Sequence, residues 1–132
     1  MSDAIILFAH GARDPLWSRP FEAVAERIRA LRPGVQVRLA FLEFMRPQLT
    51  EAGSELAALG VQHVTVVPMF LGAGSHVRRD LPNLLEDLKS RHPEVVWSLQ
   101  PAIGEATSVI EAMACEAAGA MAPVSEAGAP GS

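Results

Sequence analysis

The sequence predicts an α/β domain in which helices cover both faces of a four-stranded parallel sheet, a three-layer doubly wound architecture. Short apolar runs alternate along the chain with segments whose apolar residues recur every three or four positions. The short runs are almost continuously apolar, which is typical of parallel strands covered on both faces. Right-handed crossovers through helices join such strands, so the alternating order itself indicates this class of fold.

The pattern assigns four strands and four helices in strict alternation. Ser18 is a suitable N-cap for the first helix, and Gly60 a suitable end for the second. Asp80 is the expected cap of the third helix, which places Pro82 in its first turn. The expected elements are strands at 4–9, 35–42, 64–70 and 94–99, and helices at 18–31, 49–59, 80–91 and 109–117.

A single domain accounts for residues 1–119. The 132 residues are enough for one ordinary core, and 49% of them are hydrophobic. Residues 120–132 are small residues with glycine and proline, and we expect them to form a loose C-terminal tail.

Composition excludes several classes of function. A net charge of -4 argues against a general nucleic-acid-binding protein, which needs a surplus of Lys and Arg. Residues 4–9 are too short for a secretory signal, and no apolar stretch has the roughly 20 residues of a membrane-spanning helix. Cys115 is the only cysteine, so no internal disulfide can form and a reducing cytoplasmic location is expected.

Three metal-ligating residues follow strands of the expected sheet. His10 follows the first strand, Glu43 the second, and His76 lies in the loop after the third. Ligands bind at the carboxyl ends of parallel strands, and neighbouring strands are about 4.8 Å apart, so these side chains can converge on one ion. Two imidazoles and a carboxylate suit cobalt, iron, nickel or zinc.

The other two histidines provide a comparison. His63 precedes the third strand and His92 ends the third helix, so neither is expected to bind metal. The alternative for His10 and His76 is that they are loop histidines with backbone hydrogen bonds. Glu43 could instead cap the second helix or pair with a neighbouring arginine, Arg46.

Four arginines fall in the loops at the same edge, although the molecule as a whole is acidic. This local reversal of charge favours an anionic ligand, and the guanidinium fork suits carboxylates. Ordinary solvated surface arginines are the alternative. The four are Arg13, Arg46, Arg78 and Arg79. Nearby side chains that could form an apolar wall are Met45, Met69, Phe70 and Leu71, although core packing at the strand ends is the favoured use for most of them.

The segments that contain these residues read FAHGARDP (8–15), AFLEF (40–44) and VPMFLGAGSHVRRDLP (67–82). In this combination and order they resemble the small CbiX-type sirohydrochlorin chelatases, which are class II chelatases. The resemblance extends from about residue 5 to about residue 119. It also supports our preferred flavodoxin-like strand order, 2-1-3-4.

The resemblance implies an enzyme that inserts a divalent metal into sirohydrochlorin, an octacarboxylate tetrapyrrole. Cobalt is the first expectation, with nickel or iron as alternatives, and the metal is a substrate; no organic cofactor is expected. By position, His10 and His76 would bind the metal and Glu43 would support metal handling or proton removal. The loop arginines would meet the carboxylates. Short members of the family pair as homodimers, so a homodimer is also expected.

Two other functions compete with this interpretation. A non-catalytic metal or tetrapyrrole carrier would use the same ligands without releasing metallated product. The pair His10-Gly11 is also similar to that of phosphohistidine phosphatases, but those enzymes place an arginine before the histidine and this chain has Ala9. Serine hydrolase chemistry is weaker still, because residues 72–76 do not form a Gly-x-Ser-x-Gly motif.

Overall fold

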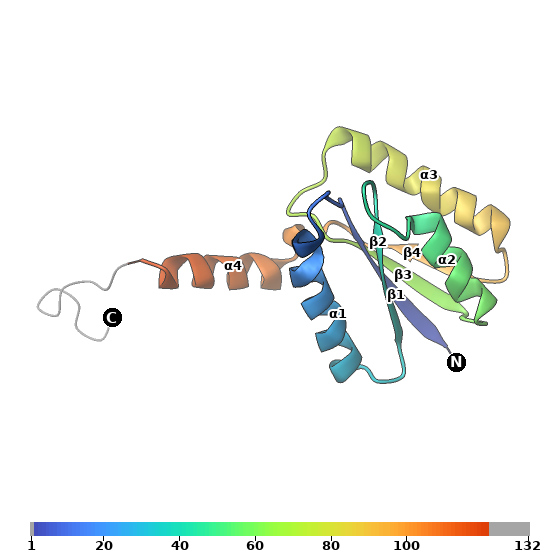
Figure 1. Cartoon of the computed structure of the whole chain (residues 1–132), viewed down its shortest axis with the longest axis horizontal. Coiled ribbons are helices and arrows are strands. Elements are labelled where there is room, and N and C mark those ends of the chain that lie inside the picture. Colours follow the sequence, from blue (N-terminus) through green and yellow to red (C-terminus); the bar gives the residue numbers. More distant parts are fainter. Residues whose placement is uncertain (1, 122–132) are drawn as a thin grey trace, which may run out of the picture.

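The computed structural model describes residues 2–121, which contain one four-stranded sheet and four α-helices (Figure 1). Two short 3-10 helices, η1 (Pro15–Ser18) and η2 (Ile103–Glu105), precede α1 and α4. The strands are β1 (Asp3–Ala9), β2 (Gln36–Phe41), β3 (His63–Pro68) and β4 (Val96–Leu99). The helices are α1 (Arg19–Leu31), α2 (Leu49–Ala58), α3 (Ser75–Arg91) and α4 (Thr107–Gly119).

All strand pairs are parallel and the sheet order is β2-β1-β3-β4, which confirms the predicted order. Ala9 is level with Phe41 on β2, and Phe8 is level with Pro68 on β3. The last residues of three neighbouring strands therefore reach the same height. The loops that follow them share one rim of the sheet, which we call the carboxyl edge.

The side chains of each strand alternate between two apolar clusters, one on each face of the sheet. Ile6 and Phe8 point into the larger cluster, which contains buried residues of α2 and α3. Leu7, between them, belongs to the smaller cluster with Ala25 of α1. The three-layer arrangement follows directly, with two helices on one face and α1 on the other (Figure 1).

Helix α4 departs from the expected architecture. It forms close to its predicted position, but none of its residues is buried and it packs against η2 rather than on the sheet. Figure 1 shows it extending away from the other elements. The sequence pattern predicts the helix correctly because helix propensity is local, but periodicity does not predict where a helix lies relative to the sheet.

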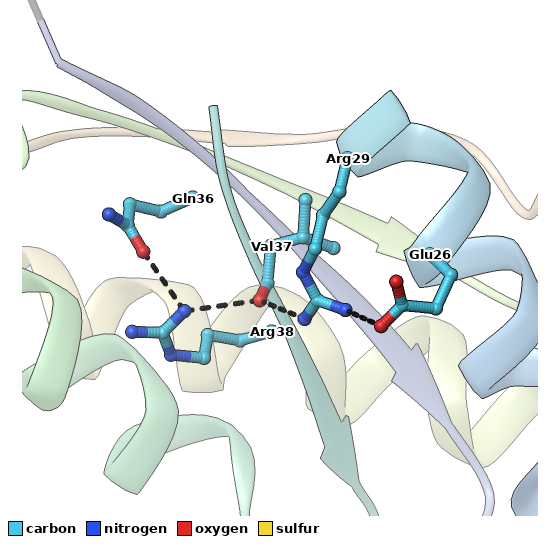
Figure 2. Close-up of polar contacts among 5 residues, drawn as sticks. All are labelled: Glu26, Arg29, Gln36, Val37 and Arg38. Atoms are coloured by element: carbon cyan, nitrogen blue, oxygen red, sulfur yellow. Dashed lines mark hydrogen bonds and ion pairs between the residues drawn. The ribbon is translucent and has the colours of Figure 1, made fainter. Parts of the chain in front are cut away.

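The free edge of the sheet at β2 is covered by arginine side chains. Arg29 of α1 donates from Nη2 to the Val37 carbonyl at 3.0 Å and pairs with Glu26 at 2.8 Å (Figure 2). Arg38 donates to the same carbonyl at 3.1 Å, and its Nε lies 2.6 Å from Glu55 of α2. Charged side chains on an exposed strand edge oppose pairing with another chain.

Helix α3 begins earlier than the sequence predicted. Its N-cap is Gly74, not Asp80, so Pro82 lies inside the helix and not in its first turn. Proline removes the single hydrogen bond that residue 82 would donate to the Arg78 carbonyl. Arg78 is exposed, so water can satisfy the freed carbonyl at little cost. The start signal at Asp80 was therefore misleading.

Smaller differences occur at other boundaries. Ser18 is the N-cap of α1 by position, but its side chain makes no capping bond; it donates to the Glu22 carboxylate at 2.8 Å instead. Strand β4 is two residues shorter than predicted. Of the expected loose tail, residues 122–132 lie outside the described residues. Within residues 2–121, none of the helices has the combined length and hydropathy to span a bilayer.

Candidate functional site at the carboxyl edge

His10 is the first residue after β1, and its backbone is tied to the loop after β2. Its carbonyl accepts a hydrogen bond from the Glu43 N–H at 3.0 Å, and the Leu42 N–H bonds to the Ala9 carbonyl at 2.9 Å. The pairing of β1 with β2 therefore continues beyond the last strand residues. As predicted, His10 and Glu43 are neighbours at the carboxyl edge, and both are exposed.

Gly11 makes this close approach possible. Its φ is +95°, a conformation that residues with a Cβ rarely adopt. A Cβ added there would lie 1.8 Å from the Glu43 carbonyl oxygen, far inside van der Waals contact. Position 11 therefore has to be glycine for the two loops to lie this close.

The loop after β3 supplies an aromatic neighbour for His10. The rings of His10 and Phe70 meet edge to face, with centroids 5.6 Å apart. Phe70 in turn packs edge to face on the buried ring of Phe8, with centroids 6.1 Å apart. This chain of rings connects the exposed imidazole to the core and limits its freedom to rotate. Of the proposed apolar wall, Phe70 is thus the member that contacts a site residue.

His76 is the second residue of α3 and not a loop residue, which corrects the prediction. The correction follows from the earlier start of the helix at Ser75. His76 remains on the carboxyl-edge side of β3 and its side chain is exposed. The helix fixes its backbone, whereas residues 69–74 make the connection from the strand.

The three predicted ligands do not form a ready-made metal cage. Within residues 2–121, no group of three or more His, Cys, Asp or Glu side chains is placed to hold one ion. His10 and Glu43 are adjacent through their backbones, while His76 starts a helix beyond the end of β3. The topology thus brings all three to one edge, and the simultaneous convergence that we expected from strand spacing is not preformed. Backbone proximity does not fix where exposed side chains point.

Glu43 takes neither of the structural roles considered as alternatives. Arg46 pairs with Glu51 in the first turn of α2, and Glu51 also accepts the Gln48 N–H at 2.8 Å. The N-cap of α2 is Gln48. Among residues 2–121 no ion pair involves Glu43, so its carboxylate is available to a ligand.

Glu51 is the titratable group with a distinct electrostatic environment. The pKa of its carboxyl lies below the ordinary value of 4.5, mainly because the carboxylate accepts the Gln48 N–H, and further because of the Arg46 charge; partial desolvation opposes the shift. Arg46 is therefore already paired, which weakens its predicted role toward an anionic ligand.

Arg13 lies over the ring of Phe44, with its guanidinium carbon 4.9 Å from the ring centroid. Both residues are exposed at the carboxyl edge, one after β1 and the other after β2. A cation–π contact of this kind orients the guanidinium without neutralising it. Arg13 is thus held at the edge with its charge available, as the prediction requires.

Arg78 and Arg79 lie in the first turns of α3, so they are helical and not loop residues as predicted. Both are exposed, and no ion pair between described residues involves them. The first turn of α3 contains no acidic residue, although acidic residues are favoured there. The nearest acidic residue in the helix is Asp80, which follows Arg79 in the next turn.

The two comparison histidines lie elsewhere. His63 opens β3 at the opposite edge of the sheet, where its Nδ1 is 3.4 Å from an Asp3 carboxylate oxygen. His92 follows α3, and its Nε2 is 2.9 Å from the Ser54 hydroxyl. Their predicted separation from the candidate site is confirmed.

Sequence reasoning missed the contribution of Phe44 and Gly104. Phe44 is a large exposed apolar residue in a conformation with φ +66°, which no sequence pattern signals. Gly104 lies so close to Leu71 that an added Cβ would be 2.3 Å from its backbone, and its N–H bonds to the Phe70 carbonyl at 2.9 Å. In the sequence, the glycine at position 104 is the only sign that these two loops come into contact.

Two solved structures illustrate what this chain is similar to. A protein described as a cobalamin (vitamin B12) biosynthesis CbiX protein, from Marinobacter aquaeolei, superimposes with a TM-score of 0.77 at 32% identity over 89% of this chain and 95% of its own. The sirohydrochlorin chelatase SirB from Bacillus subtilis, solved with cobalt, gives a TM-score of 0.77 at 25% identity over 91% of this chain and 51% of SirB. This chain therefore shares its fold with proteins named CbiX and SirB.

The CbiX family model matches residues 4–119, and the chain belongs to the CbiX family. Similar curated proteins include a sirohydrochlorin cobaltochelatase from Methanopyrus kandleri, 35% identical over 62% of this chain, and one from Saccharolobus solfataricus, 38% identical over 61%. The matched segments span 57% and 62% of those relatives.

Proposed function

We propose that this protein is a sirohydrochlorin chelatase that inserts a divalent metal, cobalt in the first instance, into the tetrapyrrole. The observation that carries the proposal is the placement of His10 and His76 at one edge of the sheet in a CbiX-family chain. The names of the curated relatives, and the cobalt and iron in SirB structures, support the same chemistry.

Insertion requires a weakly held metal and a proton acceptor on the same side of the ring. Two pyrrole protons must leave as the metal enters, so an unprotonated base has to lie beside the ligands. In the proposed mechanism His10 and His76 bind the metal as neutral imidazoles. Glu43, which has no ion-pair partner among the described residues, accepts the two ring protons one after the other and passes each to solvent. Two ligands without a closed cage favour release over storage.

The anionic substrate is proposed to bind through the arginines at the carboxyl edge. Arg13 is held on Phe44, and Arg78 and Arg79 lie near the start of α3, whose first turn has no acidic residue. Each guanidinium can make two parallel hydrogen bonds with a carboxylate. Arg46, which is paired with Glu51, is the weakest of the four candidates.

The test is an absorbance assay of metal insertion into sirohydrochlorin, with Co²⁺, Ni²⁺ or Fe²⁺ offered separately. We expect the wild type to form the metallated product with multiple turnovers, and His10→Ala or His76→Ala to lower kcat/KM at least about 100-fold. The matched control is His63→Ala, an exposed histidine at the opposite edge, which should retain wild-type turnover. Equal rates in all four proteins would refute the site.

The same assay separates an enzyme from a carrier. A carrier would bind metal or tetrapyrrole stoichiometrically and stop after one equivalent. Release of metallated product beyond one equivalent of protein is the expected result. The identity of the metal used in the cell also depends on metal supply, because intrinsic affinities follow the Irving–Williams order.

We also propose that two copies of the chain form a homodimer by exchanging α4. Four strands at about 4.8 Å spacing need two helices, each about 10 Å wide, to cover one face. One face has α2 and α3, but the other has only α1 (Figure 1). Strand β4 exposes Val96 on this face, at 54% of its full accessible area.

The direction of α4 favours a second copy over its own sheet. The chain before it is fixed at the carboxyl edge by Gly104, and hydrogen bonds continue without a break from Ile103 through Ala106 into the helix. Helix α4 thus extends away from its own subunit and exposes an apolar side. On that side Ile110 is 50% exposed and Met113 is 38% exposed. Reciprocal docking beside α1 of a partner would cover both helices and both sheets.

Size-exclusion chromatography with light scattering tests this assembly. We expect the mass of two chains for the wild type and of one chain for the double variant Ile110→Glu/Met113→Glu. Leu59→Glu, a charge placed on an exposed leucine at the end of α2, is the control and should remain dimeric. A monomeric wild type, or a double variant that stays dimeric, would refute the exchange.

We propose that the protein works in the cytoplasm, which suits its exposed, unpaired Cys115.

A further inference from the structure

Phe44 combines two features that are costly unless they serve a ligand. Its φ is +66°, the only positive value at a non-glycine residue in residues 2–121, and 58% of its side chain is exposed. Bulky residues rarely adopt a positive φ, and each such case costs of the order of 1–3 kcal/mol. An exposed phenylalanine recovers little of that cost by packing.

The turn itself accounts for the strained conformation. The Met45 N–H bonds to the Glu43 carbonyl at 2.8 Å, across Phe44 as the central residue. A hydrogen bond between residues i and i+2, with a positive φ at the residue between them, is typical of the rarer and strained form of the γ-turn. Glycine would relieve the strain, because it has no Cβ.

The surroundings keep the turn in place. The Glu43 N–H is bonded to His10, and the Glu43 carbonyl lies against Gly11. The backbone on the N-terminal side of Phe44 is therefore fixed by the site residues. The ring is held at the edge by this backbone and by its contact with Arg13, not by burial in the core.

Its position and chemistry identify what the ring can bind. Phe44 is next in sequence to Glu43, and the guanidinium of Arg13 lies over one face of its ring, which leaves the other face for a ligand. An exposed aromatic face beside a cation matches a flat, conjugated and anionic molecule, because the ring can stack and the guanidinium can bind a carboxylate.

We infer that Phe44 is a substrate-positioning residue, whose ring stacks on the tetrapyrrole while Arg13 binds one of its carboxylates. The inference rests on the proposed chelatase function and extends it to a residue outside the metal ligands. Stacking would place the plane of the macrocycle against the loop that carries Glu43. The strain stored in the turn would then serve to present the ring in one orientation.

Equilibrium binding of metal-free sirohydrochlorin, followed by its absorbance and fluorescence, tests the inference without metal or turnover. We expect Phe44→Gly and Phe44→Ala each to raise the Kd about tenfold, since stacking of this kind contributes about one factor of ten. Phe44→Tyr keeps the ring and should bind like the wild type. Leu59→Ala, which removes an equally exposed side chain away from the edge, is the matched control.

Thermal unfolding distinguishes positioning from a structural role. Phe44→Gly should melt at a temperature no lower than the wild type, and above Phe44→Ala, because glycine relieves the positive φ. Weaker binding in a protein that is equally or more stable is the expected combination. Wild-type Kd values in both ring-less variants, or a loss of stability that parallels the loss of binding, would overturn the inference alone. Failure of the wild type to bind sirohydrochlorin would overturn the proposed function as well.

Discussion

The backbone N–H of Glu43 donates to the carbonyl of His10 across 3.0 Å, so the two candidate residues are joined as if their strands had each been extended by one step. This bond places a carboxylate and an imidazole on adjacent loops whatever their side-chain rotamers. It depends on Gly11, which allows the Glu43 carbonyl to come close.

Gly11→Ala should destabilise the protein by about 2–4 kcal/mol and abolish metal insertion. The new Cβ would meet the Glu43 carbonyl oxygen at 1.8 Å and would also have to adopt a φ of +95°. Urea unfolding gives the free energy, and the insertion assay gives the activity. Gly72→Ala in the neighbouring loop has open space around it and should change stability by no more than about 0.5 kcal/mol. A folded, active Gly11→Ala variant would contradict the described approach of the loops.

Arg29→Ala should lower the free energy of unfolding by about 1 kcal/mol. The substitution leaves Arg38 as the sole side-chain donor to the Val37 carbonyl at the edge of β2, and removes the pair with Glu26 (Figure 2). Arg27→Ala provides the comparison. Arg27 is an exposed arginine two residues earlier in the same helix, and its removal should be nearly neutral. Identical urea midpoints for the two variants would show that the edge contact contributes nothing.

Glu51→Gln should lower the melting temperature at neutral pH but not at low pH. The pKa of Glu51 is lowered in the folded protein, so its carboxylate stabilises the fold above the ordinary value of 4.5. That contribution is lost as the pH falls below 4.5 through the folded pKa. Melting curves from pH 7 down to pH 3 should therefore converge for the two proteins. A constant difference over this range would exclude the carboxylate charge as the cause.

Cobalt should stabilise the protein through its two edge histidines. At a metal concentration 100 times the Kd, a ligand that binds only the folded state adds about 2.7 kcal/mol. We expect Co²⁺ to raise the melting temperature of the wild type, and to raise that of His10→Ala or His76→Ala much less. His63→Ala should respond like the wild type, because that histidine lies at the opposite edge. A full response in both edge variants would assign the metal to other ligands.

Much of the fold could be predicted because its signals are local. The continuous apolar run of β1 and the three-to-four spacing in α1 depend only on which faces are covered, and both elements form close to the predicted positions. The carboxyl-edge rule then places the residue after each strand, which is how His10 and Glu43 were identified. Both lie where the rule puts them.

The errors concern features that depend on contacts between distant segments. The sequence analysis placed Pro82 in the first turn of α3, but the helix begins at Ser75. A proline can lie inside a helix where the preceding turn is exposed and tolerates a missing hydrogen bond. No local pattern signals the direction of α4. The positive φ of Phe44 belongs to the turn closed by the Met45 N–H and the Glu43 carbonyl, which is likewise not signalled locally. The side-chain arrangement of His10, Glu43 and His76 was equally beyond the sequence, because exposed side chains take their final positions from the ligand.

The two margins of the sheet are closed to growth in different ways. On β2 the Val37 carbonyl is occupied by two guanidinium groups, while β4 spans only four residues and offers too short a template for another strand. Addition of a strand from a neighbouring molecule is therefore disfavoured on either side. Two chains can then associate only through side chains on the helices or on the open face of the sheet. Such association needs no backbone hydrogen bonds between the sheets of the two chains, and therefore does not lead to fibrous aggregates.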